Sequence, residues 1–570
     1  MRRKIEISLL IIFTAIGTGR IIAGYSQNSQ AFDEPAHVAS GLEWLDRGTY
    51  LIDPLHPPLA RVAIALPLYF AGLRLPEPAH PPEKSISYFR LGNLILYQDG
   101  QYWRNLTLAR LGVLPFFFTC TWFVYRWTRR EFGMGAALLA VVLLTSLPEI
   151  ITFAGVAYTD LPAAVMQLAL LFVFTRWLDD PSLRVTVLLG VAAGLAFLTA
   201  FTTLIFFPAA AIGLFITWII SVRREPTFST RRRQMFAQLP IAVFLGVILI
   251  WSGYRFSFKP VVEGMHLSRS SFPSFQHLPS PVRWLARAAV TSDPRIPAPE
   301  MILGFAQAYV VTHSGAKAYI LGKEHAGGVW YFFPVGLFFK NPLPFLLLSV
   351  VGVFVSFRTA GRWTVRAPGA ALLSILSVSM LQNYDAGQRH VLVAYPLMAL
   401  LAGAAGAFLW GRQASWHRAL LVALLIWQGV ATWRAGLEPM AYFNEFAGSD
   451  PSRILITGCD LDCGQDVARL GRELRSRSVE KVHVAMWSSA DLDKMNLARQ
   501  VEVLQPNEPV SGWVAVSPRS VKLGDVLHIS YPPGSFSWLQ PYKPVANAGA
   551  TIRIYCIPAS GTAERSLCPP

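Results

Sequence analysis

The sequence predicts an all-α polytopic membrane protein with a small α+β domain at its C-terminal end. Of its 570 residues, 53% are hydrophobic and only 15% are charged, whereas a typical soluble domain has about 25% charged residues. The mean hydropathy is +0.40, and the apolar residues gather in runs long enough for transmembrane helices. This composition excludes an intrinsically disordered chain and argues against an ordinary soluble enzyme.

The apolar runs predict about eleven spans of roughly 20 residues each. The first follows the basic start Met1–Lys4 and runs to about Tyr25. It resembles a signal peptide, but no small-residue cleavage site follows it cleanly, so we interpret it as an uncleaved span. The other spans are expected at about 106–125, 134–151, 161–177, 185–222 (two spans), 238–255, 342–357, 367–382, 390–410 and 418–436.

Basic residues give the predicted orientation. With the N-terminus in the cytoplasm, every predicted cytoplasmic loop carries Arg, namely 126–133, 177–184, 223–237, 358–366 and 411–418. This bias also accounts for the formal net charge of +16. Interleaved basic and aromatic patches are missing, so we expect no nucleic-acid partner. An odd number of spans places the C-terminus outside.

Three segments are then expected on the outer side: a first loop at about 25–105, a second at about 256–341, and the tail. We predict a transmembrane domain over 1–436 and a soluble domain over 437–570. The tail contains the strand-like segments VHVAMW and IRIYCI and the helix-like segment QDVARLGRELRSR. Alternating apolar residues and helical spacing indicate that this part of the chain folds as an α+β unit.

The cysteines agree with this map. Cys120 lies in an apolar span and is expected to be inert packing, while the other four lie in the tail: Cys459, Cys463, Cys556 and Cys568. Four cysteines in an outside domain predict two disulfides. A four-thiolate zinc site is the alternative, since the first pair has a C-x3-C spacing, although the second pair is far apart at C-x11-C. The spacing leaves the pairing open.

Two acidic positions fall on the predicted outer face. Asp33 and Glu34 are adjacent carboxylates just beyond the first span, and Asp160 lies in a very short outside connection. Asp33, with Pro35 following, suits a helix N-cap, and Asp160 suits one as well. The alternative is a general base held at the membrane surface. Ionisable residues are costly at this depth, so their convergence on one face favours a functional site.

Several cations fall on the same face. His56 precedes two prolines that fix an extended turn before a helix, and is either a turn residue or an anion ligand. Lys340 is expected at the outer interface, where the alternative role is a snorkelling anchor. Arg389 and His390 begin a span on the outer face, against the positive-inside bias, which favours an anionic lipid headgroup there. The residues thus predict an outward-facing cavity at lipid level.

The order of these motifs resembles that of the bacterial GT-C membrane glycosyltransferases. The motifs are Asp-Glu-Pro-x-His at 33–37, His-Pro-Pro-Leu-Ala-Arg at 56–61, Glu-His-x-x-Gly-x-Trp-Tyr-Phe-Phe-Pro at 324–334, Lys-x-Pro-Leu-Pro at 340–344 and Arg-His at 389–390. The resemblance is closest to the branch of the protein O-mannosyltransferases and the lipid A aminoarabinose transferase. The stretch 461–466, Leu-Asp-Cys-Gly-Gln-Asp, is similar to a Leu-Asp-Trp-Gly-Gln-Asp segment in some of these proteins.

The resemblance implies a GT-C fold in the bacterial inner membrane, a polyprenyl-phosphate sugar as donor, and a protein, glycolipid or glycan as acceptor. It implies a single inverting displacement in which Asp33 is the base, Glu34 its supporting neighbour and Asp160 the second acidic residue. Candidate contacts of the donor phosphate are His56, Arg61, Lys340, Arg389 and His390, and further candidates are His37, Glu324 and His325. Some enzymes of this kind use a divalent metal ion and others do not, and the sequence leaves this open.

One departure from the family pattern concerns charge. Relatives often carry Leu-Thr-Lys where this chain has Leu198-Thr199-Ala200. Either Lys340, Arg61 or Arg389 compensates for the missing lysine, or the donor or the activity has changed. A transporter or lipid flippase, or a GT-C scaffold without activity, is therefore the alternative function. The sequence shows no internal repeat, and its large outside loops favour a transferase.

Overall fold

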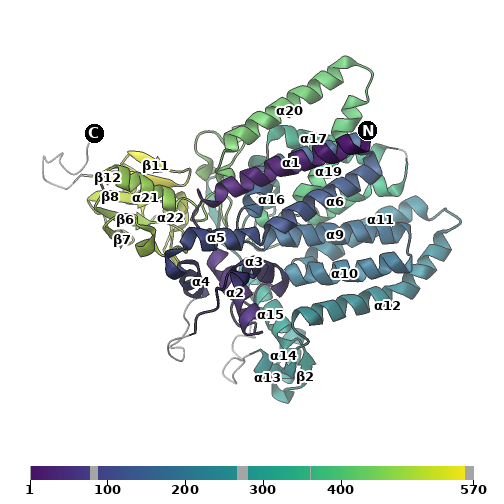
Figure 1. Ribbon diagram of the computed structural model, residues 1–570, viewed down its shortest axis with the longest axis horizontal. Helices are drawn as coiled ribbons and strands as arrows, with labels where there is room; N and C mark the ends of the chain where they lie inside the picture. The colour runs from purple at the N-terminus through teal and green to yellow at the C-terminus, as the bar shows by residue number, and fades with distance from the viewer. Residues whose placement is uncertain (1, 78–87, 266–279, 360, 559–570) are drawn as a thin grey trace.

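The computed structural model describes residues 2–77, 88–265, 280–359 and 361–558. A bundle of long helices makes up most of the chain, and a small sheet domain lies at one end of it (Figure 1). Helices occupy all the predicted spans: α1 (Arg2–Tyr25), α5 (Tyr102–Leu111) with α6 (Leu114–Phe132), α7 (Met134–Ser146) with α8 (Pro148–Ala154), α9 (Asp160–Asp179), α10 (Leu183–Thr199), α11 (Thr203–Val222), α12 (Phe228–Gly253), α17 (Leu343–Arg358), α18 (Ala367–Ser379), α19 (Ala394–Trp410) and α20 (Ser415–Ala435). The predicted fold class is confirmed.

The helices differ in whether they can cross a bilayer unaided. Within the described part of the chain, five are long and apolar enough, and a sixth is gained if α7 and α8, bent by 66°, form one broken span. Helices α10, α17, α18 and α19 have between 13 and 17 residues. Residues at the ends of the apolar runs form turns and are not part of these helices. For example, the predicted span at 390–410 begins with a 3-10 turn, η4 (Gln388–Val391).

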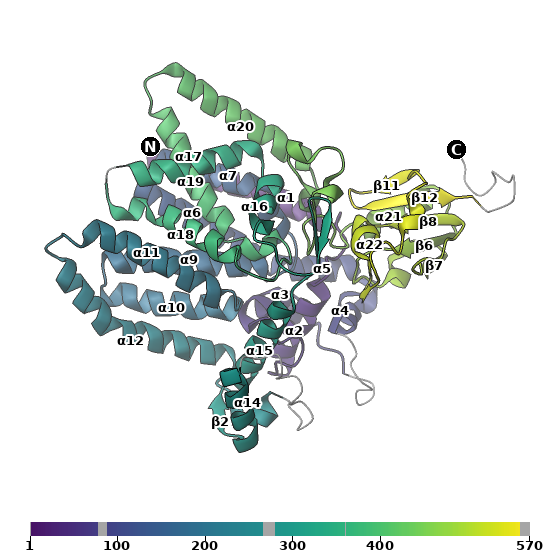
Figure 2. The same cartoon turned by 180° about the vertical axis from the view of Figure 1, so that it is seen from behind.

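Polar contacts tie together three loops that were predicted to be cytoplasmic. The Asp179 carboxylate accepts from Arg130 at 3.1 Å and from Arg362 at 2.5 Å. The Thr364 hydroxyl donates to Glu131 at 2.5 Å. The N-terminus lies toward this end of the bundle, away from the C-terminal sheet domain (Figures 1 and 2). The loops therefore share one end of the molecule, as predicted, while the cellular side of that end stays a prediction.

The C-terminal region contains a five-stranded mixed sheet with the order β11 (Ala546–Ala548), β12 (Ile552–Ile557), β8 (Gly512–Val516), β6 (Lys481–Ala485), β7 (Gln500–Val503). Strand β6 runs parallel to both neighbours, and β12 runs antiparallel to β8 and β11. Helix α21 (Val467–Ser476) packs against the sheet through a core that includes Leu470, Val482 and Ile554. The three elements predicted from the tail sequence are confirmed.

The first part of the tail packs against the helical bundle and pairs with a strand of the second outside loop. Strand β5 (Leu455–Ile456) pairs with β3 (Ala318–Ile320), which also pairs with β4 (Lys323–His325). Cys459 and Cys463 form a disulfide and belong to the hydrophobic core of the bundle. Cys556 is disulfide-bonded too, and Cys568 lies outside the described residues. The hydrophobic core of the sheet domain begins only at Val467. The residues between the predicted boundary at 436/437 and Val467 therefore include some that pack in the core of the bundle.

The two outside loops carry the remaining short elements. The first forms α2 (Glu34–Asp46), α3 (Pro58–Phe70) and α4 (Tyr88–Leu96). The second forms β1 (Phe258–Pro260), α13 (Val261–Gly264), α14 (Ser280–Ser292), β2 (Arg295–Pro297), α15 (Pro299–Ser314) and α16 (Phe332–Lys340). Helices α2 and α3 approach so closely that a Cβ on Gly41 would lie 2.1 Å from the Arg61 carbonyl oxygen. Glycine is therefore required at 41, and this contact fixes α2 and its first residues.

Candidate functional site

Asp33 and Arg389 form an ion pair at the outer-loop end of the bundle. The Arg389 Nη1 donates to Asp33 Oδ2 at 2.9 Å, although 356 residues separate them in the chain. The two side chains keep 27% and 15% of their surface exposed, so a substrate can reach them. Asp33 is the N-cap residue of α2, yet its carboxylate makes no cap bond. The structure thus unites two predicted site residues, and Asp33 occupies the predicted N-cap position while its carboxylate binds Arg389 instead of capping the helix.

Two cavities share Arg389 and Tyr384 in their walls. The first, of about 170 Å³, has apolar residues of α9, α11 and α15 in its wall, and its polar lining residues include His56, Asp160 and His390. The second, of about 390 Å³, lies between the bundle and the tail, and its wall includes Asp33. Asp160 therefore lines the first cavity and Asp33 the second, with Arg389 in both walls.

Electrostatics keep the central pair ionised. Burial alone would raise the pKa of Asp33, but Arg389, His37 and His56 hold it below its ordinary value. Burial would lower the pKa of Arg389, but the carboxylates of Asp160 and Asp33 raise it above its ordinary value. At neutral pH the site therefore contains an aspartate and an arginine that are both charged. A single guanidinium is shared between two carboxylates.

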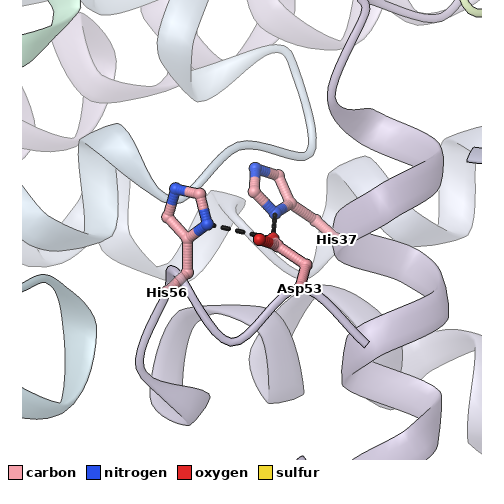
Figure 3. A group of neighbouring side chains, drawn as sticks. All are labelled: His37, Asp53 and His56. Atoms are coloured by element: carbon pink, nitrogen blue, oxygen red, sulfur yellow. Dashed lines mark hydrogen bonds and ion pairs between the residues drawn. The ribbon is translucent and has the colours of Figure 1, made fainter. Parts of the chain in front are cut away.

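A second cluster lies beside this pair. His37 comes from α2, while Asp53 and His56 come from the loop that follows it (Figure 3). Asp53 Oδ2 lies 3.0 Å from His56 Nδ1 and 3.9 Å from His37 Nδ1. Burial and the neighbouring His56 lower the pKa of His37 to about 3, although Asp53 acts in the opposite direction. His37 is therefore neutral at physiological pH.

The loop that carries Asp53 is fixed from two sides. Backbone N–H groups of Leu51 and Ile52 donate to the Glu43 carboxylate at 2.7 and 2.8 Å. Arg61 donates to the carbonyls of Ile52 and Asp53 at 3.0 and 2.5 Å. Arg61 is buried and belongs to neither cavity wall. Its predicted role as a phosphate contact is a correction: Arg61 shapes the loop that presents His56.

Glu34 is fully buried and has a different surrounding from its neighbour Asp33. Arg110 binds it through two nitrogens, each at 2.9 Å. The backbone N–H groups of Ala31 and Ala157 donate to it at 2.7 and 2.6 Å. Glu34 lines neither cavity, so it is a positioning residue that ties the first outside loop to the connection before α9. Arg110 was missed, although an arginine within a predicted apolar span was a usable signal.

Lys340 is also a structural residue, which corrects its predicted phosphate contact. Its ammonium is fully buried and lies 2.9 Å from Glu149 Oε1. It also donates to the carbonyls of Met440 and Asp460 at 2.7 and 2.6 Å. The ammonium thus donates to two backbone carbonyls, and its charge is paired with the Glu149 carboxylate. Neither cavity wall includes Lys340.

The candidates Glu324 and His325 lie apart from the site. Both are in strand β4, where Glu324 is exposed and the His325 ring nitrogen lies 3.5 Å from the Tyr331 hydroxyl. Neither lines the two cavities, which corrects their prediction as site residues. By contrast, His390 lines the first cavity, and its Nε2 has no hydrogen-bond partner among the described residues.

The aromatic and tail residues of the site were not predicted from the sequence. The Tyr158 hydroxyl accepts from the Asp33 backbone N–H at 2.8 Å and so fixes the start of α2. In the tail, Arg519 lies over the Trp487 ring at 4.2 Å, and Trp487 stacks on Phe32 with ring centroids 3.9 Å apart. Arg519, Trp487 and Phe32 line the second cavity. These contacts carry no local sequence signal because they join residues of different elements that only the folded structure brings together.

Comparison with known proteins gives one family match. Residues 105–260 match the family model described as dolichyl-phosphate-mannose-protein mannosyltransferase. The match covers less than half of the chain and confirms the predicted resemblance over that segment, which runs from α5 to β1. No match was found among curated protein sequences.

Solved structures with a similar arrangement of the chain include ArnT from Cupriavidus metallidurans bound to undecaprenyl phosphate. The identity is 14%, 97% of this chain and 98% of that chain are covered, and the TM-score is 0.47. The apo state of the same ArnT has 14% identity, 96% and 97% coverage, and a TM-score of 0.47. The archaeal oligosaccharyltransferase AglB from Archaeoglobus fulgidus, in complex with an inhibitory peptide and a dolichol-phosphate, has 11% identity, 91% and 70% coverage, and a TM-score of 0.44.

Proposed function

We propose that the protein is a membrane glycosyltransferase that moves a sugar from a polyprenyl-phosphate donor to an acceptor hydroxyl. The observation that carries this proposal is the Asp33–Arg389 pair, which borders two cavities of different character. The family description of residues 105–260 supports the same class of enzyme. We further propose a location in the bacterial inner membrane, with the N-terminus in the cytoplasm and the tail outside.

The first cavity suits the donor. Leu55, Ile205 and Val311 are among its apolar lining residues, which come from the helical bundle and the two outside loops. An isoprenoid chain gains free energy by burial against such a surface. His56, Arg389 and His390 line the same cavity, and cationic or N–H donor groups form strong hydrogen bonds with phosphate oxygens. The donor would therefore bind with its phosphate near Arg389 and its chain toward the membrane helices.

The second cavity suits the acceptor. Its wall joins the outside loops to the tail and includes Phe32, Trp487, Arg519 and Lys317. Asp33 lines this cavity and not the first. An acceptor hydroxyl entering from this side would reach the carboxylate while the donor sugar lies beyond Arg389. The protein, glycolipid or glycan nature of the acceptor is left open by these residues.

The reaction would be a single displacement. The acceptor oxygen forms a bond to the anomeric carbon, the bond from that carbon to the phosphate oxygen breaks, and the hydroxyl proton passes to Asp33. The polyprenyl phosphate leaves with the electron pair, and Arg389, His56 and His390 stabilise its charge. Because Arg389 binds Asp33 at 2.9 Å in the described structure, the donor phosphate would take over this guanidinium and free the carboxylate.

The direct test is sugar transfer in membranes that contain the protein. A panel of radiolabelled polyprenyl-phosphate sugars is offered, and labelled acceptor is separated from labelled donor. We expect transfer from at least one donor. A folded protein that transfers no sugar from any donor but moves the lipid-linked donor across the bilayer would contradict the proposal and indicate the flippase alternative.

A separate prediction concerns Ala200, which lines the first cavity. Ala200→Lys adds a cation to a wall that already faces the proposed phosphate. We expect the affinity for undecaprenyl phosphate to rise roughly tenfold, the effect of one additional charge-assisted hydrogen bond of about 1.5 kcal/mol. Binding to purified protein in detergent measures it. Ala200→Met, which has a long uncharged side chain, is the matched control, and equal affinities of the two variants would contradict a phosphate near Ala200.

A further inference from the structure

His37, Asp53 and His56 form a compact group of metal-binding side chains. One ligand atom from each lies within 4.8 Å of the other two. Figure 3 shows that each imidazole ring directs a nitrogen at the carboxylate of Asp53. Two imidazoles and one carboxylate are a typical ligand set for zinc and related divalent ions.

The burial of these residues and a missing hydrogen bond indicate that they bind a cation. His37 has 2% of its surface exposed, and its Nδ1 has no hydrogen-bond partner among the described residues. It faces Asp53 Oδ2 at 3.9 Å, which is too long for a hydrogen bond. A buried polar atom without a partner is costly. A cation between the two side chains would satisfy both of them.

The spacing is close to what such an ion requires. Ligands of a tetrahedral zinc ion at about 2.0 to 2.2 Å are separated by roughly 3.3 to 3.5 Å. Asp53 Oδ2 lies 3.0 Å from one imidazole nitrogen and 3.9 Å from the other. The third separation, between the ligand atoms of the two imidazoles, is within 4.8 Å. Shifts of about 0.5 Å in the first two distances and of up to about 1.3 Å in the third produce the required geometry. The backbone that carries Asp53 is already held by Glu43 and Arg61.

We infer that His37, Asp53 and His56 bind one divalent transition-metal ion, with zinc as the representative ion. Three protein ligands leave a fourth coordination position, as in zinc sites that bind an exogenous group. His56 lines the first cavity, so that position is accessible to an anion in this cavity. Given the proposed function, on which this role rests, the ion would hold the donor phosphate together with Arg389.

The first experiment measures metal binding and does not depend on transfer activity. Full-length protein in detergent is stripped with EDTA, reloaded with Zn²⁺ or Co²⁺, and its metal content is determined by mass spectrometry. We expect one ion per chain and a cobalt spectrum without a thiolate-to-cobalt charge-transfer band. Asp53→Asn and His37→Gln should weaken binding by at least about tenfold, while His325→Gln, which alters a histidine outside both cavities, should bind as the wild type does.

Three results would overturn the metal site. They are the absence of bound metal in the wild type, equal metal binding by all the variants, and a thiolate band that assigns the ion to the tail cysteines. Folding is checked by melting curves, because Asp53→Asn and His37→Gln should melt at the temperature of EDTA-stripped wild type. A variant that melts far below stripped wild type is replaced by His56→Gln, whose side chain is more exposed.

The second experiment tests whether the bound ion contributes to phosphate binding. Undecaprenyl phosphate is titrated into stripped and zinc-loaded wild type, and we expect at least a tenfold higher affinity in the loaded protein. If zinc-loaded and stripped protein bind undecaprenyl phosphate with equal affinity, the ion has no role in phosphate binding, although the metal site itself remains supported. Metal binding together with absent sugar transfer would contradict the proposed function and not the metal site.

Discussion

Asp33→Asn is expected to lower the rate of sugar transfer by about 10²- to 10⁴-fold, the usual contribution of a general base. Asparagine keeps the size of the side chain and can accept the Arg389 hydrogen bond, now 2.9 Å long, but it cannot take the acceptor proton. The loss should therefore fall on kcat, while KM for the donor changes much less. Single-turnover and steady-state transfer by purified protein in lipid vesicles would measure both constants.

The stability of this variant should stay close to that of the wild type. Asn and Asp are equally good at helix N-caps, and the Asp33 side chain makes no cap bond to lose. Asp99→Asn is the matched control, because Asp99 is an exposed carboxylate in the same outside loop and lines neither cavity. Equal losses of activity in the two variants, or a folded Asp33→Asn protein with wild-type kcat, would contradict the assignment of Asp33 as the base.

The sequence predicted correctly which residues lie at the same end of the bundle, because the order and direction of the spans determine this. Asp33, Asp160 and Arg389 were placed on one face because each follows or precedes an apolar run at its predicted outer end. The structure joins them through an ion pair and a shared cavity wall. The tail elements were also predicted correctly, because the apolar and β-branched residues of β6 and β12 are a local property of the sequence.

The sequence was less informative where the role of a charge depends on its partner. Lys340 and Arg61 are basic residues in motifs near the membrane surface, yet their donors are used by Glu149 and by backbone carbonyls. Such partners lie far away in the chain or in a loop whose conformation only the folded structure defines. Asp53 was not among the candidate site residues, and its position beside two histidines depends on the packing of α2 against α3.

Lys340→Met is expected to destabilise the protein by about 3 to 5 kcal/mol, the usual cost of removing one partner of a buried ion pair. Glu149 would keep a buried charge without its cation, and the carbonyls of Met440 and Asp460 would each lose a donor. These carbonyls join the tail to the bundle, so the junction near residue 460 should loosen first. Thermal unfolding in detergent and proteolysis of the tail are the measurements.

The double variant Lys340→Met/Glu149→Gln distinguishes this structural role from the predicted phosphate contact. Neutralising Glu149 removes the unpaired charge, so the double variant should be more stable than Lys340→Met alone by up to about 3 kcal/mol. Lys323→Met is the matched control, because Lys323 is an exposed lysine in β4 and its loss should change stability by no more than about 0.5 kcal/mol. If Lys340→Met instead melts as the wild type does and loses affinity for undecaprenyl phosphate, Lys340 reaches the donor in solution and its buried pair with Glu149 is not the dominant state. The burial of Lys340, its ion pair with Glu149 and its two hydrogen bonds to backbone carbonyls argue for the structural outcome.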